Sequence, residues 1–432
     1  MEKISFKTDL VIIGDGIASL ALALLATQRG IRTVILGKKF KGTTYSATGW
    51  IAARPDYLLA DEELVKRTAF ECSRWAKMFS PQILEGKLNL IPIGPETPHS
   101  IRSFNALFTS YDELAKARSE NFEKHFFINP TVLEKMEPNL RRKNIKGAIA
   151  VREWTVNPAT LMQRLEQEIS IRPDLVKKFE IEDFQEFKIG SDHLVKEITV
   201  TDNTGKLVKI SNDRGPMLVV NATGPWIKDV CARLGIAINY QLRVGVQMEI
   251  PGYFFQNNII TFGDDGKYIA CLQKRGVLQV GPTNSNFTDH PDNFIPPDKD
   301  IDYLIETLKN LLEDKKVPSY SFLKHGFRVK PTTIDTNRPV IWNHGKDGIH
   351  NLYSLHPGKM ALALLAGDEM LDRAISDGWL IKNKASVGSP IHLDGNRRVF
   401  NEAKLFLLKI KSLLKFGLFY LKFLCKSKTP LP

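Results

Sequence analysis

Cysteine is scarce in this sequence, and the few cysteines stand far apart. The four are Cys72, Cys231, Cys271 and Cys425, and no C-x-x-C pair occurs among them. A disulfide framework or a cysteine-held zinc or iron–sulfur site needs cysteines in recurring close spacings. We therefore expect reduced thiols, a cytoplasmic protein and no metal site.

Long hydrophobic runs are also missing. No stretch reaches the roughly 18 uncharged apolar residues that a membrane-spanning helix needs. Asp15 interrupts the first apolar stretch, so we expect no signal peptide. Charge is unbalanced instead, because the formal net charge is +12 at pH 7. Such an excess suits an anionic partner, such as a phosphorylated substrate or an acidic membrane surface.

A strand, a glycine turn and a helix open the chain. Residues 9–14 form an apolar run typical of a buried parallel strand, and residues 20–28 have a helical pattern. Between them, Gly14 and Gly16 match the first two positions of G-x-G-x-x-G, and Ser19 takes the third. The first two glycines allow a tight turn and a close approach to a pyrophosphate. The helix N-terminus, with Ile17 and Ala18, then offers N–H groups to phosphate.

The second strand, residues 31–36, lacks the acid that usually follows it. In dinucleotide-binding folds a carboxylate near this point binds the ribose hydroxyls. Here Gly37 and Lys38 stand at the strand end, with no Asp or Glu between them and Asp15. Lysine there suits the 2′-phosphate of NADP. The other reading is FAD, with its ribose held by backbone or by the hydroxyls of Thr43 and Thr44.

Further along, a β-rich block interrupts α/β sequence. The sequence has helical patterns at 62–78, 111–121 and 158–169 and a strand-like alternation at 196–210. An apolar strand at 217–224 follows, and residues 239–290 are β-rich. We expect an α/β fold, with a Rossmann-like nucleotide-binding domain and an inserted antiparallel-sheet substrate domain. The expected nucleotide domain comprises 1–90, 150–235 and 325–385, the substrate or cap domain 91–149 and 236–324, and a tail 386–432.

Several segments together resemble one flavoprotein family, in the order in which that family has them. The family contains FAD-dependent glycerol-3-phosphate dehydrogenases and D-amino-acid oxidase, and the likeness is strongest to the anaerobic catalytic-subunit type of the former. The segments that carry the resemblance are residues 9–20, 41–50, 133–162, 219–226, 325–342 and 352–372. The resemblance implies FAD rather than NADP, and hydride transfer to flavin N5.

The resemblance also implies where the flavin would lie. The loop after the second strand, with Gly49, would wrap the flavin, and Gly224 would close a turn near the pyrophosphate. The turn at 356–360 would approach the isoalloxazine. The expected cofactor residues outside the glycine turn are Gly37, Lys38, Thr43, Thr44, Gly49, Ala222, Thr223, Gly224, Pro357, Gly358, Lys359 and Met360.

Substrate and catalytic residues follow from the same resemblance. Arg328 and Arg338 match the two arginines of the family's C-terminal segment, and a guanidinium suits phosphate or carboxylate. His356 is the first choice for the base, and Lys359 can bind an anionic group. Arg54 and Tyr57 are further candidates for substrate binding, together with Arg328 and Arg338. The loop departs from the family at Ala52, where a histidine is usual, so the exact substrate stays open.

The C-terminal stretch 401–426 is strongly amphipathic. Its lysines 404, 411, 415, 422 and 426 are spaced by 7, 4, 7 and 4, which puts them on one face of a helix. Most other residues are Leu, Phe or Ile. This pattern favours a helix lying on an anionic membrane surface over one docked on protein. We therefore expect peripheral attachment to the inner face of the membrane.

The sequence thus predicts an FAD-dependent dehydrogenase for a small anionic hydroxy substrate, with glycerol 3-phosphate as the type. Electrons would pass to quinone or a partner protein, and no nucleic acid would bind. Two alternatives stay open: an amino-acid or 2-hydroxy-acid oxidase or dehydrogenase of the same fold, and a non-catalytic flavin-binding subunit. An NADP-dependent reductase rests only on the lysines after the second strand.

Overall fold

The computed structural model describes residues 3–38, 42–52, 61–79, 83–94, 97, 101–116, 123–141, 143–263, 267–332 and 337–381. Residues Met1–Ser386 form one compact unit. The expected tail at 386–432, with its amphipathic stretch 401–426, lies outside the described residues. No helix in the described ranges is both long and apolar enough to span a membrane.

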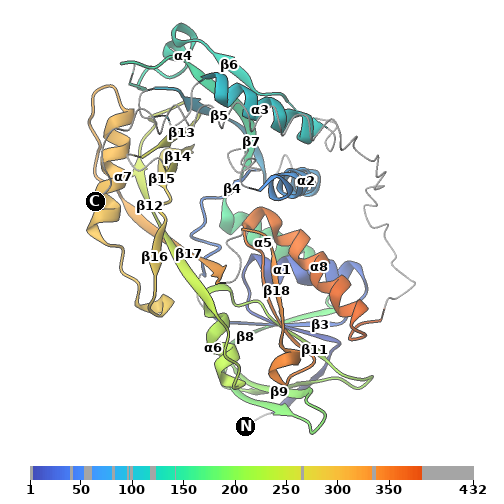
Figure 1. The fold of residues 1–432 in the computed structure, drawn as a ribbon. Coiled ribbons are helices and arrows are strands. Elements are labelled where there is room, and N and C mark those ends of the chain that lie inside the picture. The colour runs from blue at the N-terminus through green and yellow to red at the C-terminus, as the bar shows by residue number, and fades with distance from the viewer. Residues whose placement is uncertain are drawn as a thin grey trace, which may run out of the picture. The chain divides into compact units, whose positions relative to one another are not determined.

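A nine-stranded sheet carries the nucleotide-binding unit that the sequence predicts (Figure 1). Its order is β1-β10-β9-β8-β3-β2-β11-β19-β18, and β8, β3, β2, β11 and β19 run parallel to their neighbours in this central part. The strands are β1 (Lys3–Lys7), β2 (Leu10–Ile13), β3 (Thr33–Lys38), β8 (Val176–Ile189), β9 (Val195–Asp202), β10 (Leu207–Ser211), β11 (Leu218–Asn221), β18 (Val340–Asn343) and β19 (Leu352–His356).

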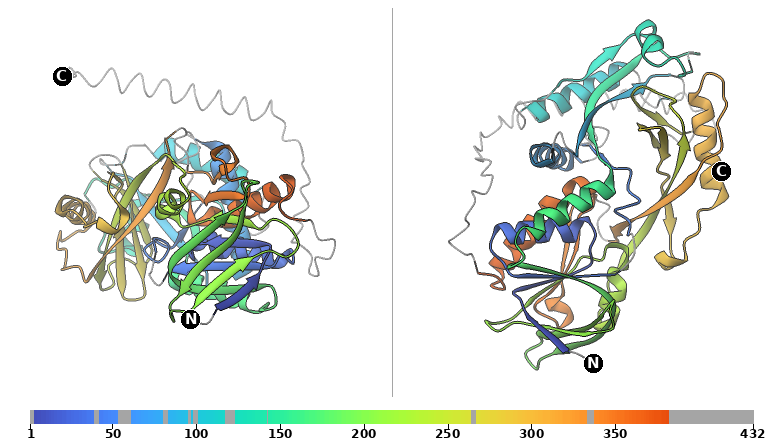
Figure 2. Two further views of the ribbon diagram at one scale, coloured as in Figure 1. Left: turned by 90° about the horizontal axis from the view of Figure 1, so that it is seen from below. Right: turned by 180° about the vertical axis from the view of Figure 1, so that it is seen from behind.

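Three helices cover one face of this sheet, with α1 in the middle (Figure 2). Almost every side chain of α1 is apolar and buried, because α5 and α8 flank it while the sheet lies beneath. Gly367 of α8 permits this packing, since a Cβ there would lie 2.8 Å from Leu25. The helices are α1 (Ile17–Gln28), α5 (Pro158–Ser170) and α8 (Ala363–Ser376); α6 (Ile227–Arg233) lies on the other face.

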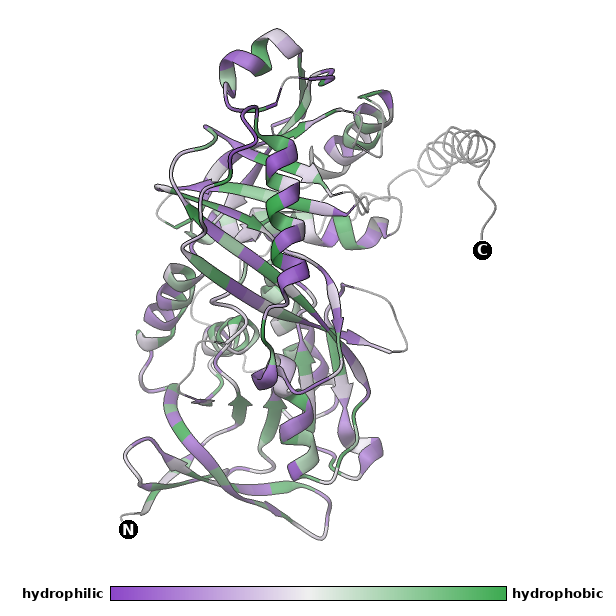
Figure 3. Ribbon diagram, turned by 90° about the vertical axis from the view of Figure 1, so that its left-hand side faces the viewer, coloured by the Kyte–Doolittle hydropathy of each residue, from purple (hydrophilic) through white to green (hydrophobic). Residues whose placement is uncertain are grey.

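A second sheet of ten strands is mostly antiparallel. Helices α2 and α3 pack on one of its faces, and α4 and α7 on the other. Alternating polar and apolar bands along α7 in Figure 3 reflect its half-buried position. The strands are β4 (Trp50–Ile51), β5 (Glu85–Pro92), β6 (Phe126–Ile128), β7 (Ala148–Thr155), β12 (Tyr240–Pro251), β13 (Asn258–Phe262), β14 (Tyr268–Lys274), β15 (Val277–Gly281), β16 (Ser285–Phe287) and β17 (Phe322–Pro331). The helices are α2 (Glu62–Phe79), α3 (Ile101–Lys116), α4 (Pro130–Met136) and α7 (Asp298–Leu311).

The predicted fold class is confirmed, since one sheet is largely parallel with helices on its faces and the other is largely antiparallel. The domain boundaries stay a prediction. Three of the predicted boundaries, at residues 90, 150 and 325, fall inside β5, β7 and β17 of the ten-stranded sheet. The alternation expected as one strand at 196–210 is a hairpin of β9 and β10, because residues 203–206 form a turn.

Candidate functional site

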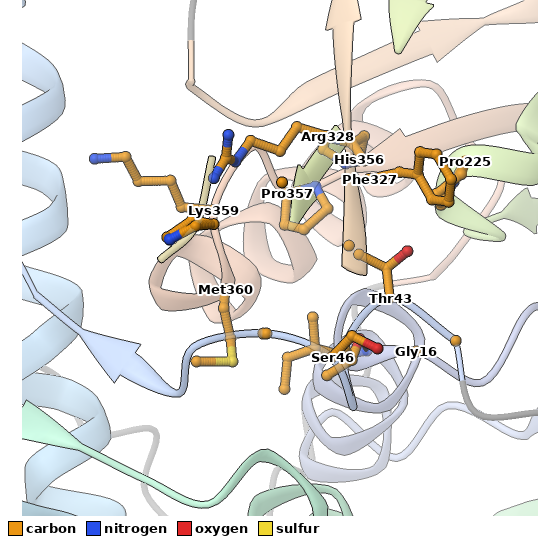
Figure 4. A pocket seen from close by; sticks show the side chains of 18 of the residues that line it. Gly16, Thr43, Ser46, Pro225, Phe327, Arg328, His356, Pro357, Lys359 and Met360 are labelled. Atoms are coloured by element: carbon orange, nitrogen blue, oxygen red, sulfur yellow. Dashed lines mark hydrogen bonds between the residues drawn. The ribbon is translucent and has the colours of Figure 1, made fainter. Parts of the chain in front are cut away.

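A cavity of about 1380 Å³ lies at the carboxyl ends of β2, β3, β11 and β19. The ten-stranded sheet supplies its far wall through β12, β14 and β17. Parallel α/β sheets bind ligands at this edge, because the loops that follow the strands converge there. Figure 4 shows residues from both sheets around the cavity, among them Gly16, Thr43, Arg328 and His356.

The glycine turn lines the cavity as the sequence predicts. Gly14 has a φ of +113°, and a Cβ there would lie 2.7 Å from the carbonyl oxygen of Ala222. Gly14, Gly16, Ile17 and Ala18 all line the cavity. A dinucleotide turn needs such close backbone approach, and glycine alone permits it at Gly14.

Ser19, at the third position of the glycine pattern, packs inside the protein. Its side chain is fully buried, and its hydroxyl donates to the carbonyl oxygen of Ala222 at 3.4 Å. Ser19 is not among the described residues that line the cavity. The change from glycine therefore alters the contact between α1 and β11 rather than the cavity surface.

The loop after β3 forms one wall of the cavity. Thr43, Thr44, Ser46 and Thr48 line it, and the Thr44 hydroxyl accepts a hydrogen bond from the backbone N–H of Ile17 at 3.1 Å. The hydroxyl oxygen of Thr43 is buried and has no hydrogen-bond partner among the described residues. An unpaired buried hydroxyl carries a desolvation cost that a bound polar group would remove.

Gly49 stands behind this loop rather than in the cavity lining. Its φ is +70°, and a Cβ there would lie 1.9 Å from the carbonyl oxygen of Val156. The backbone N–H of Val156 donates to Gly49 at 2.7 Å. Gly49 therefore lets the loop pass close to the end of β7.

The ends of β3 and β11 complete the nucleotide half of the cavity. Lys38 lines it, whereas Gly37 is covered by the side chain of Asp15. Ala222, Thr223 and Gly224 also line it. Gly224 has a φ of +62°, and no atom lies within 4 Å of the position that a Cβ would take.

The turn after β19 lies across the cavity from the loop that follows β3. His356, Pro357, Gly358, Lys359 and Met360 all line the cavity. Gly358 has a φ of +70°, and a Cβ there would lie 2.1 Å from the carbonyl oxygen of Asn337. Substitution of Gly358 would thus be opposed both by backbone strain and by a clash with the chain before β18.

His356 is bound to its own turn. The backbone N–H of Gly358 donates to Nδ1 of His356 at 3.0 Å. Burial lowers the pKa of His356 to about 4, so the ring is neutral at pH 7. Because Nδ1 is the acceptor, the neutral ring carries its proton on Nε2. Its chemistry in the cavity is therefore that of a hydrogen-bond donor.

The two candidate arginines have different surroundings. Arg328 lines the cavity, and its Nη1 donates to Oδ1 of Asn284 at 3.0 Å. Arg338 is not among the described residues that line the cavity; its Nε donates to Oδ2 of Asp61 at 2.9 Å. Asp61 does line the cavity, and the hydrogen bond from Arg338 lowers the pKa of that carboxyl. Arg54 and Tyr57 lie outside the described residues.

Sequence reasoning missed several lining residues. Gln247 and Asn284 come from strands or turns of the ten-stranded sheet, and Asp15 comes from the glycine turn itself. Gln247 and Asn284 stand in no recognisable motif, so only the pairing of distant strands shows their role. Asp15 did carry a signal, because it is the last carboxylate before the acid-free strand end.

The cavity fits a dinucleotide such as FAD. Along one wall it offers a glycine turn, free space next to the backbone of Gly224, and the Thr43 hydroxyl, which has no hydrogen-bond partner among the described residues. Its volume lies above the range of about 300–1,000 Å³ usual for small-molecule pockets,. Among the described residues, no group of three or more His, Cys, Asp or Glu side chains could hold a metal ion.

Comparison with known proteins gives relatives that are glycerol-3-phosphate dehydrogenases. An aerobic glycerol-3-phosphate dehydrogenase of Staphylococcus haemolyticus is 25% identical over 378 residues, covering 84% of this chain and 64% of that protein. A glycerol-3-phosphate dehydrogenase of Synechocystis is 22% identical, with 84% and 69% covered. The chain thus spans 64% of the length of the first of these relatives.

Solved structures share the fold at low identity. The glycerol-3-phosphate dehydrogenase from Bacillus halodurans, complexed with FAD, has a TM-score of 0.66 at 17% identity, covering 88% of this chain and 66% of that chain. L-proline dehydrogenase from P. horikoshii also has a TM-score of 0.66 at 17% identity, covering 88% and 96%. The family described as FAD dependent oxidoreductase matches residues 9–373, and the chain belongs to that family.

Proposed function

We propose that this chain is an FAD-dependent dehydrogenase that oxidises a small anionic hydroxy compound of the glycerol 3-phosphate kind. The observation that carries the proposal is that Arg328 and Lys359 line the same cavity as the glycine turn. Two cations there supply a binding site for an anionic group next to the place where the family binds its flavin. The named dehydrogenase relatives support the same substrate class.

The reaction removes a hydride from the carbon that bears the hydroxyl, and the hydroxyl proton passes to solvent water. Bound FAD supplies the two-electron acceptor, at flavin N5. Arg328 would hold the anionic end of the substrate, and Asn284 would fix the guanidinium through its 3.0 Å hydrogen bond. Lys359, in the turn that follows β19, would add positive charge. These contacts orient the C–H bond and so lower the entropic cost of reaction.

His356 has a different role in this proposal from the base that the sequence suggests. Its Nδ1 accepts from Gly358, and its ring is neutral with the proton on Nε2. A group in that state donates a hydrogen bond and does not take a proton. We assign His356 to orientation of the substrate oxygen and of the turn at 356–360.

The rival substrate class is an amino acid or 2-hydroxy acid. Arg338, the second arginine of the expected pair, forms an ion pair with Asp61, and only Arg328 of the two lines the cavity. A single guanidinium matches a carboxylate, which it can bind in a bidentate manner. This observation keeps the carboxylate class as the second candidate.

An anaerobic substrate screen separates these functions. The purified flavoprotein is mixed without oxygen with glycerol 3-phosphate, lactate-type hydroxy acids or amino acids, and flavin absorbance is followed. Bleaching by glycerol 3-phosphate alone supports the proposal, and bleaching by carboxylates alone supports the rival. No bleaching by any of them, with flavin bound, supports a non-catalytic flavin-binding subunit. Arg328→Lys is expected to raise the KM for the active substrate about tenfold or more, since bidentate binding is lost.

Electron transfer to quinone, and attachment to the inner face of the membrane, form a further part of the proposal. Its support is the lysine stripe in residues 401–426. Anionic lipid attracts such a stripe by about 1 kcal/mol for each lysine near the surface. Co-sedimentation of the full chain with anionic but not neutral vesicles is expected. A variant with Lys404, Lys415 and Lys422 changed to Glu should lose that binding, and equal binding of both proteins would refute the attachment.

A further inference from the structure

The ribose end of the cofactor site lacks its usual acid. In a dinucleotide-binding βαβ unit, the carboxylate that binds the ribose hydroxyls stands near the end of the second strand. Here that strand is β3, and it ends in Gly37 and Lys38. Both belong to the part of the chain that the structure describes, and neither can accept hydrogen bonds from hydroxyls through its side chain.

The side chain of Asp15 fills the space above Gly37. A Cβ at Gly37 would lie 2.7 Å from Cβ of Asp15 and 2.8 Å from its Oδ2. Gly37 has no unusual backbone angle, since it is absent from the glycines with positive φ. Glycine is therefore required at position 37 by the close approach of Asp15 and not by backbone conformation. The carboxylate stands next to the site from which a residue 37 side chain would project.

The Asp15 carboxylate is held in place yet remains accessible. Its Oδ2 lies 3.7 Å from Nζ of Lys178, which also pairs with Glu166 on α5. Asp15 lines the cavity, and 31% of its side chain is exposed. Burial raises the pKa of this carboxyl, while the charge of Lys178 opposes that rise. Hydroxyl donors from a ligand would compensate for the water that burial removes.

We propose that Asp15 is the carboxylate that accepts hydrogen bonds from the ribose hydroxyls of the adenosine half of FAD. The carboxylate is therefore in the glycine turn and not at the end of β3, and Gly37, which has no side chain, leaves the space that it occupies. This assignment rests on FAD as the cofactor and on no particular substrate. It also explains why Lys38 does not indicate binding of the 2′-phosphate of NADP, because a carboxylate beside Gly37 repels that phosphate.

Nucleotide competition tests the assignment without measuring activity. The probes are ADP, 2′,3′-dideoxy-ADP and adenosine 2′,5′-bisphosphate, each used to displace FAD from the protein while flavin fluorescence is followed. Hydrogen bonds to a charged group are stronger than those between neutral groups, so ADP should bind at least about tenfold more tightly than its dideoxy form. Asp15→Asn should abolish most of this preference. Glu166→Gln is the matched control, because it changes the other partner of Lys178 and keeps Asp15.

A reciprocal exchange keeps the test decisive if Asp15→Asn binds FAD poorly. Gly37→Asp alone should clash with Asp15 and weaken FAD binding, whereas Asp15→Gly with Gly37→Asp should restore the preference for ADP. An Asp15→Asn protein that still prefers ADP tenfold would overturn the assignment, as would tightest binding of the 2′,5′-bisphosphate. Absence of FAD binding by the unmodified chain would instead count against the proposed function.

Discussion

The side-chain amide of Gln247 donates a hydrogen bond of 2.8 Å to the backbone carbonyl oxygen of Ser46. Gln247 is on β12 of the ten-stranded sheet, and Ser46 is in the loop that follows β3 of the other sheet. Lys274 adds a second bond of the same kind, from its Nζ to the carbonyl oxygen of Thr48 at 2.9 Å. One wall of the cofactor cavity is thus fixed by the opposite sheet.

Replacing Gln247 by Leu should loosen this wall. The change removes the donor to Ser46 and leaves a carbonyl oxygen in a part-buried place, at a cost of about 1–3 kcal/mol,. Because the loop lines the cavity, we expect FAD affinity to fall about tenfold, measured by quenching of flavin fluorescence. Gln241→Leu, at the exposed N-terminal end of the same strand, is the control. Equal FAD affinity of the two variants would contradict the role of Gln247.

The pH profile of the enzyme tests the state of His356. With its pKa near 4, this ring should produce no change in kcat/KM between pH 6 and 7. His356→Asn keeps an oxygen that can accept from Gly358, so activity should fall by less than about tenfold,. A change of kcat/KM near pH 6.5 that is present in the unmodified protein and absent in His356→Asn would show that the ring acts as a base.

The buried carboxyl of Glu71 should make the stability of the protein depend on pH. Its side chain is 1% exposed, and Nη1 of Arg74 lies 3.7 Å from its Oε2, beyond hydrogen-bond distance. Burial raises the pKa of Glu71 to about 7, above the usual value of 4.5. The folded protein therefore binds a proton that the unfolded chain releases between pH 4.5 and 7.

Stability should accordingly fall as pH rises through this window. A shift from 4.5 to about 7 corresponds to about 3 kcal/mol in the free energy of unfolding,. Glu71→Gln, which stays neutral, should remove the fall and raise the melting temperature above pH 7. Glu369→Gln, which breaks a half-exposed ion pair with Arg67, should change stability by no more than about 1 kcal/mol,. Parallel pH curves for Glu71→Gln and the unmodified protein would contradict the prediction.

How far the sequence predicts this structure depends on the range of the interactions involved. The glycine turn and α1 follow from local spacing, yet the helix begins at Ile17 and not at Leu20 because the turn itself supplies the first helical residues. Helix α3 was expected at 111–121 but begins at Ile101. Its first turns include Ser103 and Asn105, weak helix formers, and are stabilised by burial of Phe104 and Phe108 against the ten-stranded sheet.

The site divides in the same way. Gly14, Gly16 and the turn at 356–360 are local patterns, and all of them line the cavity. The contact of Asp15 with Gly37 and that of Gln247 with Ser46 each join segments that are far apart in the sequence. Only the parallel pairing of β2 with β3 and the approach of the two sheets bring these pairs together. Single-sequence periodicity contains no information on such pairs.

The ion pair of Arg338 and Asp61 affects the charge of the cavity, because Arg338 neutralises the Asp61 carboxylate that lines it. Asp61 lines the cavity and also accepts from the backbone N–H of Leu64 at 3.0 Å, near the start of α2. Arg338→Met would leave this carboxylate without its guanidinium partner, and an anionic substrate would be repelled. We expect the KM to rise about tenfold or more, with a smaller change in kcat. Adding Asp61→Asn removes the repelling charge and should restore most of the KM, as a double-mutant cycle would measure. If Arg338 instead contacts the substrate directly, the second change will restore nothing, and Arg338 belongs to the substrate site after all.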